Sequence, residues 1–359
     1  MSYVSCLMSH VLCLIFVYNL SMSILKDQRI ILGVTGSIAA YKAADLASML
    51  TQAGSRLDVI LTRAAEAFVS PLTFQSLTGQ KAYTDTELWG GESHILHVGL
   101  GHKADLLLIA PCTANSLAKL AHGQANDLLS ITALAAQAPL LVAPAMDVGM
   151  YEHPATQENV RVLKARGIHF AGPAEGRMAS GLSGRGRMLQ PAEIIGQARL
   201  VLGKQGDLAG KKILITAGGT REAIDPVRFI SNRSSGKQGY ALAQAALDAG
   251  AAVTLISAPT ALTPPVGAAL ISVQSAEEMK NAVLAEAEEA DALIMAAAAA
   301  DFRPVEVSGK KLKKRDGIPQ IELEATPDIL KTVASLKPGA SRPRVVVGFA
   351  AESRDLLAN

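Results

Sequence analysis

The sequence predicts an α/β protein made of two doubly wound, Rossmann-like domains. Short apolar runs of strand length alternate with helical patterns over residues 28–200, and the same alternation starts again over residues 208–359. Alternation of this kind is typical of parallel sheets that carry helices on both faces. The length of 359 residues suits two domains, and a hydrophobic content of 49% with only 4% aromatic residues suits small aliphatic side chains packed between helices and sheets.

Charge and cysteine usage argue against several classes of protein. The net charge of +2 gives no indication of a nucleic-acid or membrane-surface partner. The three cysteines, Cys6, Cys13 and Cys112, form no CxxC pair, so they predict neither a disulfide framework nor a zinc ribbon. We therefore expect a cytoplasmic protein whose partners are small molecules.

We interpret residues 1–27 as an extension outside the fold. Its one apolar run, residues 11–18, is too short to span a bilayer, which takes about 20 residues. No Lys or Arg precedes the run, so the charged start of a signal peptide is missing. The extension is disordered or reflects an early start assignment with Met22 as the true start, and a weak membrane anchor is the alternative. The polar residues 200–209 predict the linker between the domains.

In the first domain we expect four strands with helices between them. The carboxyl ends of parallel strands share one edge of a sheet, and ligands bind there, so the turns that follow the strands are the candidates for a site. The expected strands cover residues 29–35, 57–62, 106–110 and 140–143, and the expected helices cover residues 38–53, 114–121 and 155–166.

Polar turns follow three of these strands. The first strand leads into GVTGSIAAYK, which lacks GxGxxG, and no acidic residue closes the second strand, so a dinucleotide site is disfavoured. A mononucleotide phosphate held by Gly36, Ser37 and the helix N-terminus is compatible with the pattern. Residues 111–116 and 144–147 follow the third and fourth strands. Each turn alone is typical of helix capping, but three at one sheet edge favour a ligand site.

Three histidines, His94, His97 and His102, fall close together. They could form a metal site with Cys112, although the spacing fits no standard zinc pattern. They could equally be solvated, or one of them could transfer a proton, since imidazole titrates near neutral pH. The residues alone leave these alternatives open.

Several motifs of this domain resemble the FMN-binding cysteine decarboxylases, in particular the phosphopantothenoylcysteine decarboxylase half of a bifunctional enzyme of coenzyme A biosynthesis. They are GVTGSIAAYK, HVGLGHKADLLLIAPCTANS, HGQANDLL, APAMDVGMYEHPATQENV and SGRGRMLQP. The resemblance implies that His97 is catalytic, because it lies eight residues before Asp105. It also implies that FMN is bound by Gly36, Ser37, Thr62, Thr113, Ala114, Asn115 and Met146, with no metal ion in the site.

The sequence departs from this family at two catalytic positions. Asp147 stands where the family has the Asn that holds the substrate carboxylate, and an ionised Asp accepts hydrogen bonds but repels a carboxylate. Ser180 stands where the family has the Cys that donates a proton when the enethiol intermediate is reduced, and Ser is a far weaker acid. The glycines around Ser180 suit a mobile flap, or a plain surface loop.

The second domain contains a candidate anion site. Residues 213–216 read as a buried strand, two glycines, Gly218 and Gly219, follow it, and a basic, hydroxyl-rich loop leads to a helix near Tyr240. Free backbone N–H groups and the helix dipole favour an anion there, although the pattern also fits an ordinary crossover. Further expected strands cover residues 252–257, 270–273, 293–297 and 345–349, and further helices cover residues 241–249 and 276–289.

DPVRFISNRSSGKQG, with ITAGGTRE before it, closely resembles the phosphopantothenate–cysteine ligase half of the same bifunctional family. The resemblance implies that Arg228 and Asn232 act at an acyl-cytidylate and that Lys311, ten residues after Asp301, stabilises charge while it forms. Lys311 lies in the run KKLKK, which without the resemblance reads as a solvated loop. The nucleotide-binding residues implied are Gly218, Gly219, Ala297, Asp301, Lys311, Thr326, Pro327, Asp328, Ile329 and Phe349, the last within VGFAAE.

The resemblance covers residues 28–359 and implies two reactions. The second domain would join 4′-phosphopantothenate to cysteine with CTP and Mg²⁺, and the first would decarboxylate the product with FMN to 4′-phosphopantetheine. It also implies homo-oligomers through both domains, with flavin sites shared between subunits. The family continues past the position of Asn359, so the ligase domain reads as incomplete. The alternatives are a flavin decarboxylase for another thiol with an inactive ligase half, or a flavin-binding regulatory subunit.

Overall fold

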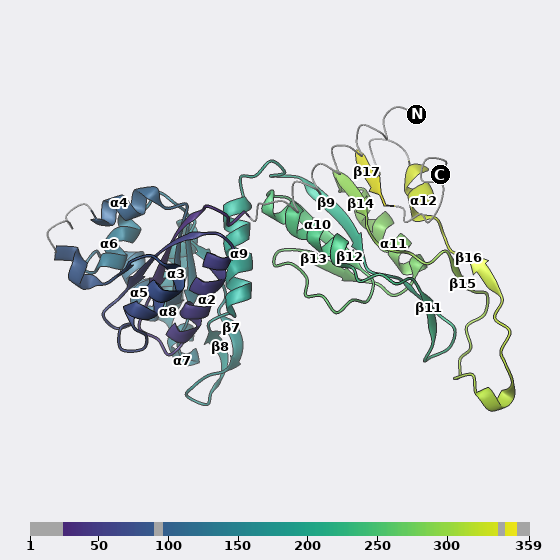
Figure 1. Ribbon diagram of the computed structural model, residues 1–359, viewed down its shortest axis with the longest axis horizontal. Coiled ribbons are helices and arrows are strands. Elements are labelled where there is room, and N and C mark those ends of the chain that lie inside the picture. Colours follow the sequence, from purple (N-terminus) through teal and green to yellow (C-terminus); the bar gives the residue numbers. More distant parts are fainter. Residues whose placement is uncertain (1–23, 90–95, 337–341, 350–359) are drawn as a thin grey trace. The chain divides into compact units, whose positions relative to one another are not determined.

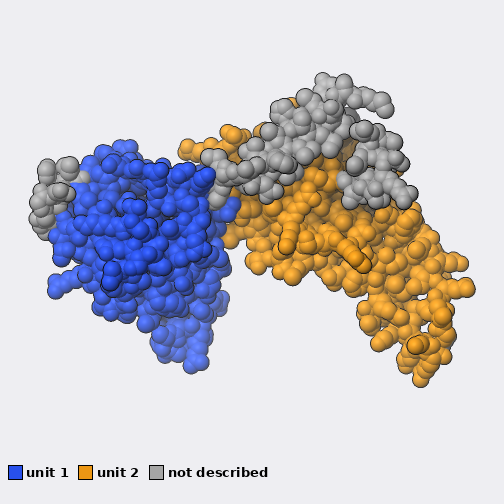
Figure 2. All heavy atoms as spheres, viewed as in Figure 1, with its two compact units in different colours: residues 1–202 blue, residues 203–359 orange. Residues whose placement is uncertain are grey.

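The computed structural model describes residues 24–89, 96–336 and 342–349. The fold consists of two compact units, residues 1–202 and 203–359, which Figure 2 shows in different colours. Among the described residues, no helix combines the length and the apolar character that crossing a membrane requires. Each unit is an α/β structure built on a mainly parallel sheet, which is the fold class that the sequence predicts (Figure 1).

A six-stranded parallel sheet forms the centre of the first unit, in the order β3-β2-β1-β4-β5-β6. The chain therefore reverses its direction of winding between β1 and β4, and the crevice at such a switch point is where ligands bind in this class of fold. The strands are β1 (Arg29–Val34), β2 (Arg56–Leu61), β3 (Ala82–Tyr83), β4 (Leu106–Cys112), β5 (Leu140–Pro144) and β6 (His169–Phe170).

Helices cover both faces of this sheet because the strands alternate apolar side chains to either side. On β1, Leu32 and Val34 pack into one core cluster with α2, whereas Ile31 packs into another with α5 and α8. The helices are α2 (Ala40–Gln52), α3 (Pro71–Thr78), α4 (Leu96–Lys103), α5 (Ala114–His122), α6 (Leu128–Ala135), α7 (Val148–Glu152), α8 (Pro154–Ala165) and α9 (Pro191–Gly203), with a 3-10 helix η1 (Asp85–Trp89).

The prediction that residues 1–27 lie outside the fold is wrong for residues 24–27. Leu25 is 1% exposed and belongs to the core of the first unit. Its carbonyl accepts a hydrogen bond of 2.8 Å from the hydroxyl of Ser55. The amide of Asp27 donates one of 2.9 Å to the carbonyl of Gly54. Residues 24–27 are therefore part of the folded unit; residues 1–23 lie outside the described residues.

The segment interpreted as a flap or a surface loop is a β-hairpin, formed by β7 (Ala174–Arg177) and β8 (Ser183–Arg187). It lies against the turn that follows β5, where the amide of Met146 donates a hydrogen bond of 3.0 Å to the carbonyl of Gly186. A Cβ atom on Gly186 would lie 2.4 Å from the carbonyl oxygen of Met146, and one on Gly184 would lie 2.6 Å from Val148. These glycines therefore allow the close approach of hairpin and turn.

The second unit contains a five-stranded parallel sheet in the order β13-β12-β9-β14-β17, with a switch point between β9 and β14. Helix α10 begins at Lys237, earlier than predicted, because Gly236 adopts a left-handed conformation just before it. The strands are β9 (Lys212–Ala217), β12 (Ala252–Ser257), β13 (Ala269–Ser272), β14 (Ala292–Met295) and β17 (Val345–Gly348), and the helices are α10 (Lys237–Asp248), α11 (Ala276–Ala287) and α12 (Ile329–Ala334).

Two small antiparallel pairs extend from this second sheet. One joins β10 (Arg221–Ala223) to β11 (Phe229–Ser231), and the other joins β15 (Phe302–Pro304) to β16 (Leu323–Ala325). The chain between β15 and β16 forms a long arm with a 3-10 helix, η3 (Lys314–Asp316), at its far end (Figure 1). This arm contains the basic run KKLKK.

Candidate active sites

Two adjoining cavities open at the carboxyl ends of β1, β4 and β5, the strands on either side of the switch point. Their volumes are about 610 and 740 Å³. They share Gly36, Thr113 and Met150, so they form one continuous candidate site, which we call the first-unit cavity. All seven residues expected to bind FMN line it, namely Gly36, Ser37, Thr62, Thr113, Ala114, Asn115 and Met146.

Hydrogen bonds between the strand ends fix the shape of this cavity. The Thr35 hydroxyl donates to the carbonyl of Pro111 at 2.8 Å and accepts from the amide of Thr113 at 3.2 Å. The side chain of Thr113 in turn caps α5. Gly36 is needed because a Cβ atom there would lie 2.5 Å from the Cβ of Ala64, just after the end of β2. Three strand ends are thereby held together around the cavity.

Lys42 is a cavity residue that sequence reasoning missed. It lies on α2, is 6% exposed and donates a hydrogen bond of 3.1 Å from Nζ to the carbonyl of Met188. Burial, followed by the neighbouring Arg187, lowers the pKa of this ammonium group. A signal was available, because Lys42 precedes Leu46 and Leu50 at four-residue intervals and so shares their buried face. An amine in this wall favours an anionic ligand.

Asp147 and Ser180, the two residues that depart from the family pattern, both line the first-unit cavity. Asp147 caps α7, and Ser180 lies in the turn of the β7–β8 hairpin. The cavity wall beside them contains Arg177, Arg187, Met178 and Met188. This part of the cavity thus combines basic and apolar side chains with one carboxyl group.

His97 does not line the first-unit cavity of its own chain. It lies on α4, and its Nδ1 atom is buried and has no hydrogen-bond partner among the described residues. His102 lies on the same helix, and His94 lies outside the described residues. Within the described ranges, no group of three His, Cys, Asp or Glu side chains could hold a metal ion. Cys112 is fully buried, and this burial raises the pKa of its thiol.

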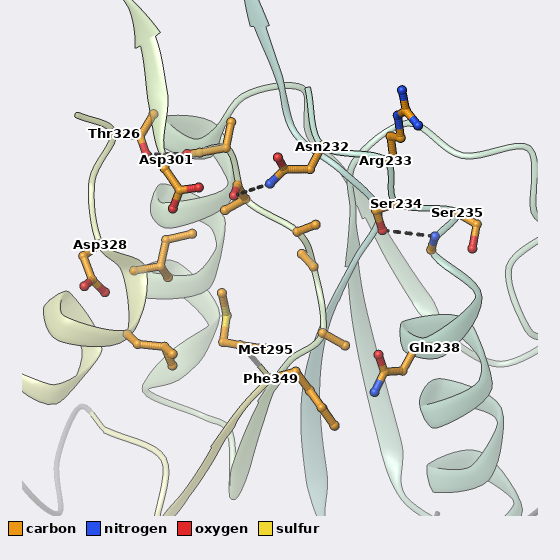
Figure 3. A pocket seen from close by; sticks show the side chains of 18 of the residues that line it. Asn232, Arg233, Ser234, Ser235, Gln238, Met295, Asp301, Thr326, Asp328 and Phe349 are labelled. Carbon is orange, nitrogen blue, oxygen red and sulfur yellow. Dashed lines mark hydrogen bonds between the residues drawn. The ribbon is translucent and has the colours of Figure 1, made fainter. Parts of the chain in front are cut away.

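The second unit has a cavity of about 1150 Å³ at the carboxyl end of β14. Asp301, Thr326 and Asp328 lie on one side, Ser234, Ser235 and Gln238 lie on the other, and Met295 and Phe349 lie between them (Figure 3). Eight expected residues line this second-unit cavity, namely Asn232, Ala297, Asp301, Thr326, Pro327, Asp328, Ile329 and Phe349. The remaining residues of VGFAAE from 350 onward lie outside the described residues.

Backbone contacts hold the polar walls of the second-unit cavity. Asn232 donates from Nδ2 to the carbonyl of Ala299 at 2.9 Å, and the Thr326 hydroxyl donates to the carbonyl of Ala300 at 2.5 Å. Asp328 caps α12 by accepting from the amide of Lys331, and this hydrogen bond is the main reason that the pKa of its carboxyl lies below the usual value. The opposite wall is the start of α10, whose first backbone N–H groups favour an anion.

Gly218 and Gly219 do not line this cavity, so their expected role as nucleotide ligands is not supported by their position. A Cβ atom on Gly218 would lie 2.8 Å from the carbonyl oxygen of Ala258. One on Gly219 would lie 2.9 Å from the carbonyl oxygen of Asn232. The two glycines instead allow β9 and its neighbouring loops to pack closely behind Asn232.

Arg228 and Lys311 also lie outside the cavity lining of their own chain. Arg228 is paired with the buried carboxylate of Asp225, and Lys311 is exposed in the arm between β15 and β16. Sequence resemblance implies that both basic side chains act in the site. A motif match, however, carries no information on where a long loop folds.

Both halves of the chain match known family models. Residues 20–199 match the flavoprotein family, and residues 208–359 match the DNA/pantothenate metabolism flavoprotein C-terminal domain. The coenzyme A biosynthesis bifunctional protein CoaBC of Bacillus subtilis (strain 168) is 48% identical over 335 residues, which cover 92% of this chain and 82% of that protein. Its counterpart in Mycobacterium tuberculosis is 47% identical over 336 residues, covering 91% and 80%.

Two solved structures illustrate the similarity of the two halves. A mutant PPC decarboxylase complexed with pantothenoylaminoethenethiol is 32% identical with a TM-score of 0.45, and the match covers 49% of this chain and 98% of that one. The C-terminal domain of a CoaBC protein is 48% identical with a TM-score of 0.35, covering 40% and 66%. The identity and coverage of the curated relatives decide the family: the chain belongs to the coenzyme A biosynthesis bifunctional proteins.

Proposed function

We propose that the chain catalyses two consecutive steps of coenzyme A biosynthesis. The second unit ligates 4′-phosphopantothenate to cysteine with CTP, and the first unit decarboxylates the resulting 4′-phosphopantothenoylcysteine to 4′-phosphopantetheine with FMN. The supporting observation is that each unit has a cavity at its switch point, lined by the residues that carry the resemblance. The near full-length similarity to CoaBC proteins supports both activities in one chain.

The lining of the first-unit cavity fits FMN. Ser37, Thr113 and Asn115 offer hydrogen-bonding groups at two helix starts, whereas Met146, Met150 and Met188 offer an apolar wall. A mononucleotide with a polar phosphate end and a flat apolar ring needs both kinds of surface. When bound, FMN supplies the two-electron oxidation of the substrate thiol and later returns the electrons.

The protein's own groups would hold the substrate and move protons. Asp147 and Lys42 line the part of the cavity beside Met146, together with Arg177 and Arg187 of the β7–β8 hairpin. His97 lies outside this lining, so it handles a proton only where a neighbouring subunit brings it to the cavity. Our proposal therefore includes a homo-oligomer through the first unit, and a second contact between subunits through the ligase unit.

The second-unit cavity would bind CTP. Phe349 would pack on the base, residues 326–329 would contact the nucleotide, and the start of α10 would face the phosphates. Asp301 and Asp328 are the carboxylates of its lining, and Mg²⁺ that accompanies CTP prefers such oxygen ligands.

The ligation would proceed in two displacements. The carboxylate of 4′-phosphopantothenate attacks the α-phosphorus of CTP, and pyrophosphate leaves. The amine of cysteine then attacks the acyl carbon, and CMP leaves. Lys311 would stabilise the charge of the first step, and Asn232 and Arg228 would act on the acyl-cytidylate. These assignments come from the motif match, with Asn232 supported by its place in the cavity.

The test is product analysis with the purified full-length chain. With 4′-phosphopantothenate, cysteine, CTP and Mg²⁺, mass spectrometry should detect 4′-phosphopantothenoylcysteine and then 4′-phosphopantetheine, together with CMP. Supplying 4′-phosphopantothenoylcysteine directly tests the decarboxylase alone. Unchanged substrates in both assays, with FMN bound according to its absorption spectrum, would refute the proposed function.

A further inference from the structure

The β10–β11 hairpin of the second unit contains a buried carboxylate to which the family match assigns no role. The side chain of Asp225 is 0% exposed, and it lies in the turn between β10 and β11 together with Arg228. It lines neither cavity described above. A buried carboxylate is unfavourable unless its oxygens are fully hydrogen-bonded, so its partners indicate what it does.

The two oxygens of Asp225 have different partners. Oδ1 accepts from the backbone amides of Val227 and Arg228, both at 2.8 Å, which closes the local turn. Oδ2 accepts from Nε of Arg228 at 2.9 Å, from Nη2 of the same side chain, and from the amide of Leu312 at 3.1 Å. The hydrogen bonds from the Arg228 side chain, more than any other cause, hold the pKa of this carboxyl well below its usual range.

Arg228 completes the connection to the distant arm. Its Nη2 also donates to the carbonyl of Leu312 at 2.7 Å. At the other end of the same stretch, the amide of Ser308 donates to the carbonyl of Ile224 at 3.0 Å. Residues 308–312 are therefore fastened to the hairpin at both ends. Lys311 lies inside this fastened stretch, next to the residue that Asp225 and Arg228 hold.

A purely local role does not account for this arrangement. The turn needs only Oδ1, whereas Oδ2 and the guanidinium group contact a residue more than 80 positions further along the chain. The two cations expected to act in successive steps of ligation, Arg228 and Lys311, are thus linked through one carboxylate.

We propose that Asp225 is a positioning residue for the ligation reaction, which sets Arg228 and the Lys311 segment in a single arrangement. This inference rests on the proposed function of the second unit. Asp225 lies outside the lining of the second-unit cavity and acts through the guanidinium group of Arg228 and the main chain of Leu312.

Asp225→Asn separates the positioning role from the turn. The amide oxygen can still accept the two backbone hydrogen bonds at Oδ1, but the amide nitrogen cannot accept from Arg228 or Leu312. We expect kcat of ligation to fall about 10- to 100-fold, the range that a displacement of roughly 1 Å can cause. KM for CTP should stay within about twofold, because Asp225 lies outside the nucleotide cavity.

Two further variants make this result interpretable. Asp291→Asn is the matched control, since Asp291 also accepts from a backbone amide, that of Lys212, and from a lysine, but lies at the amino end of β14. It should leave ligation unchanged. Asp225→Glu keeps the charge beside Arg228 with one extra methylene group and should give an intermediate kcat. Decarboxylation of 4′-phosphopantothenoylcysteine by the first unit of the same chain reports the amount of chain in each assay.

A second measurement does not depend on ligation. Trypsin cleaves after lysine and arginine, and residues 310–315 contain five such sites. Release of the segment should speed cleavage there several-fold in Asp225→Asn but not in Asp291→Asn. Wild-type cleavage and wild-type kcat in Asp225→Asn would overturn the assignment, as would equal losses in kcat and in affinity for CTP. A wild-type chain without ligase activity would instead refute the proposed function. The trypsin assay would still show whether Asp225 holds the segment, so the two failures can be distinguished.

Discussion

Ser180 donates a hydrogen bond of 2.5 Å from its hydroxyl to Oδ2 of Asp147. The two positions at which this chain departs from the cysteine decarboxylase pattern are therefore in direct contact. The other oxygen of Asp147 accepts from the amide of Gly149 at 3.1 Å, so the carboxylate also caps α7. The pair joins the β7–β8 hairpin to the turn after β5, and its two members must be considered together.

We predict that exchanging the pair toward the family pattern gives non-additive effects. Asp147→Asn removes the charge that orients the serine hydroxyl, and Ser180→Cys replaces that hydroxyl with a weak donor. Because the two side chains are in contact, the rate of the double variant should differ from the product of the two single effects. Contacting residues typically couple by about 0.5–3 kcal/mol. The check is a double-mutant cycle on the decarboxylation rate, with FMN content measured for every variant.

The control for this cycle is a serine whose hydroxyl has no contact with Asp147. Ser76 on α3 is suitable, because its hydroxyl donates within its own helix, to the carbonyl of Leu72 at 2.9 Å. Combining Ser76→Cys with Asp147→Asn should give additive rates. Additive effects in the cycle of Asp147 and Ser180 themselves would show that their contact has no part in the reaction.

A second prediction concerns Gly219, which lies behind Asn232. Gly219→Ala places a methyl group 2.9 Å from the carbonyl oxygen of Asn232, so that loop must shift. Asn232 is held by its hydrogen bond to Ala299, and we expect its displacement to lower kcat of ligation about 10- to 100-fold. Steady-state kinetics with CTP and cysteine tests this. Unchanged ligation would mean that the loop accommodates the methyl group without displacing Asn232.

Much of the sheet structure could be predicted from the sequence. Long apolar strands such as β1, β4 and β9 are recognisable because both of their faces are buried. The two-residue strands β3 and β6 escape such prediction, because two residues carry no periodicity. The β7–β8 hairpin also escapes it, because its glycines and basic residues give no strand pattern, and the hairpin is held by its contact with the turn after β5.

The candidate sites are most predictable where a residue directly follows a strand. Thr113 and Asp147 line a cavity because strand topology alone puts them at one sheet edge. Lys42 does not follow a strand, and a lysine on a helix is expected in solvent, so its four-residue spacing with Leu46 and Leu50 is the signal of its burial. Lys311 can be assigned from a motif, but its place depends on a long arm whose path is set by Asp225 and Arg228.

A third prediction tests the nucleotide cavity through Phe349. This side chain lines the cavity and is 36% exposed, so part of its surface is accessible to a base. Phe349→Ala should raise KM for CTP about 5- to 150-fold, as stacking of a base on an aromatic ring typically contributes about 1–3 kcal/mol. The value of kcat should change little, because stacking contributes equally before and during the reaction. A change confined to kcat would mean that the base of CTP does not stack on Phe349.

The last prediction concerns acid stability and Asp225. Its carboxyl has a lower pKa in the folded chain than in the unfolded chain, chiefly because of the hydrogen bonds from Arg228. The unfolded chain therefore binds more protons, and the contribution of Asp225 is present above the unfolded pKa of about 3.9 and is lost as pH falls toward the lowered value. Asp225→Asn has no such group. The free energy of unfolding of the wild type should therefore exceed that of this variant by a constant amount from neutral pH down to about pH 5. This advantage should shrink below about pH 4. Hydrogen exchange of the β9 amides at several pH values measures the free energy of opening in both proteins. An advantage that stayed constant down to the lowest pH would mean that pairing with Arg228 does not lower the pKa of this carboxyl.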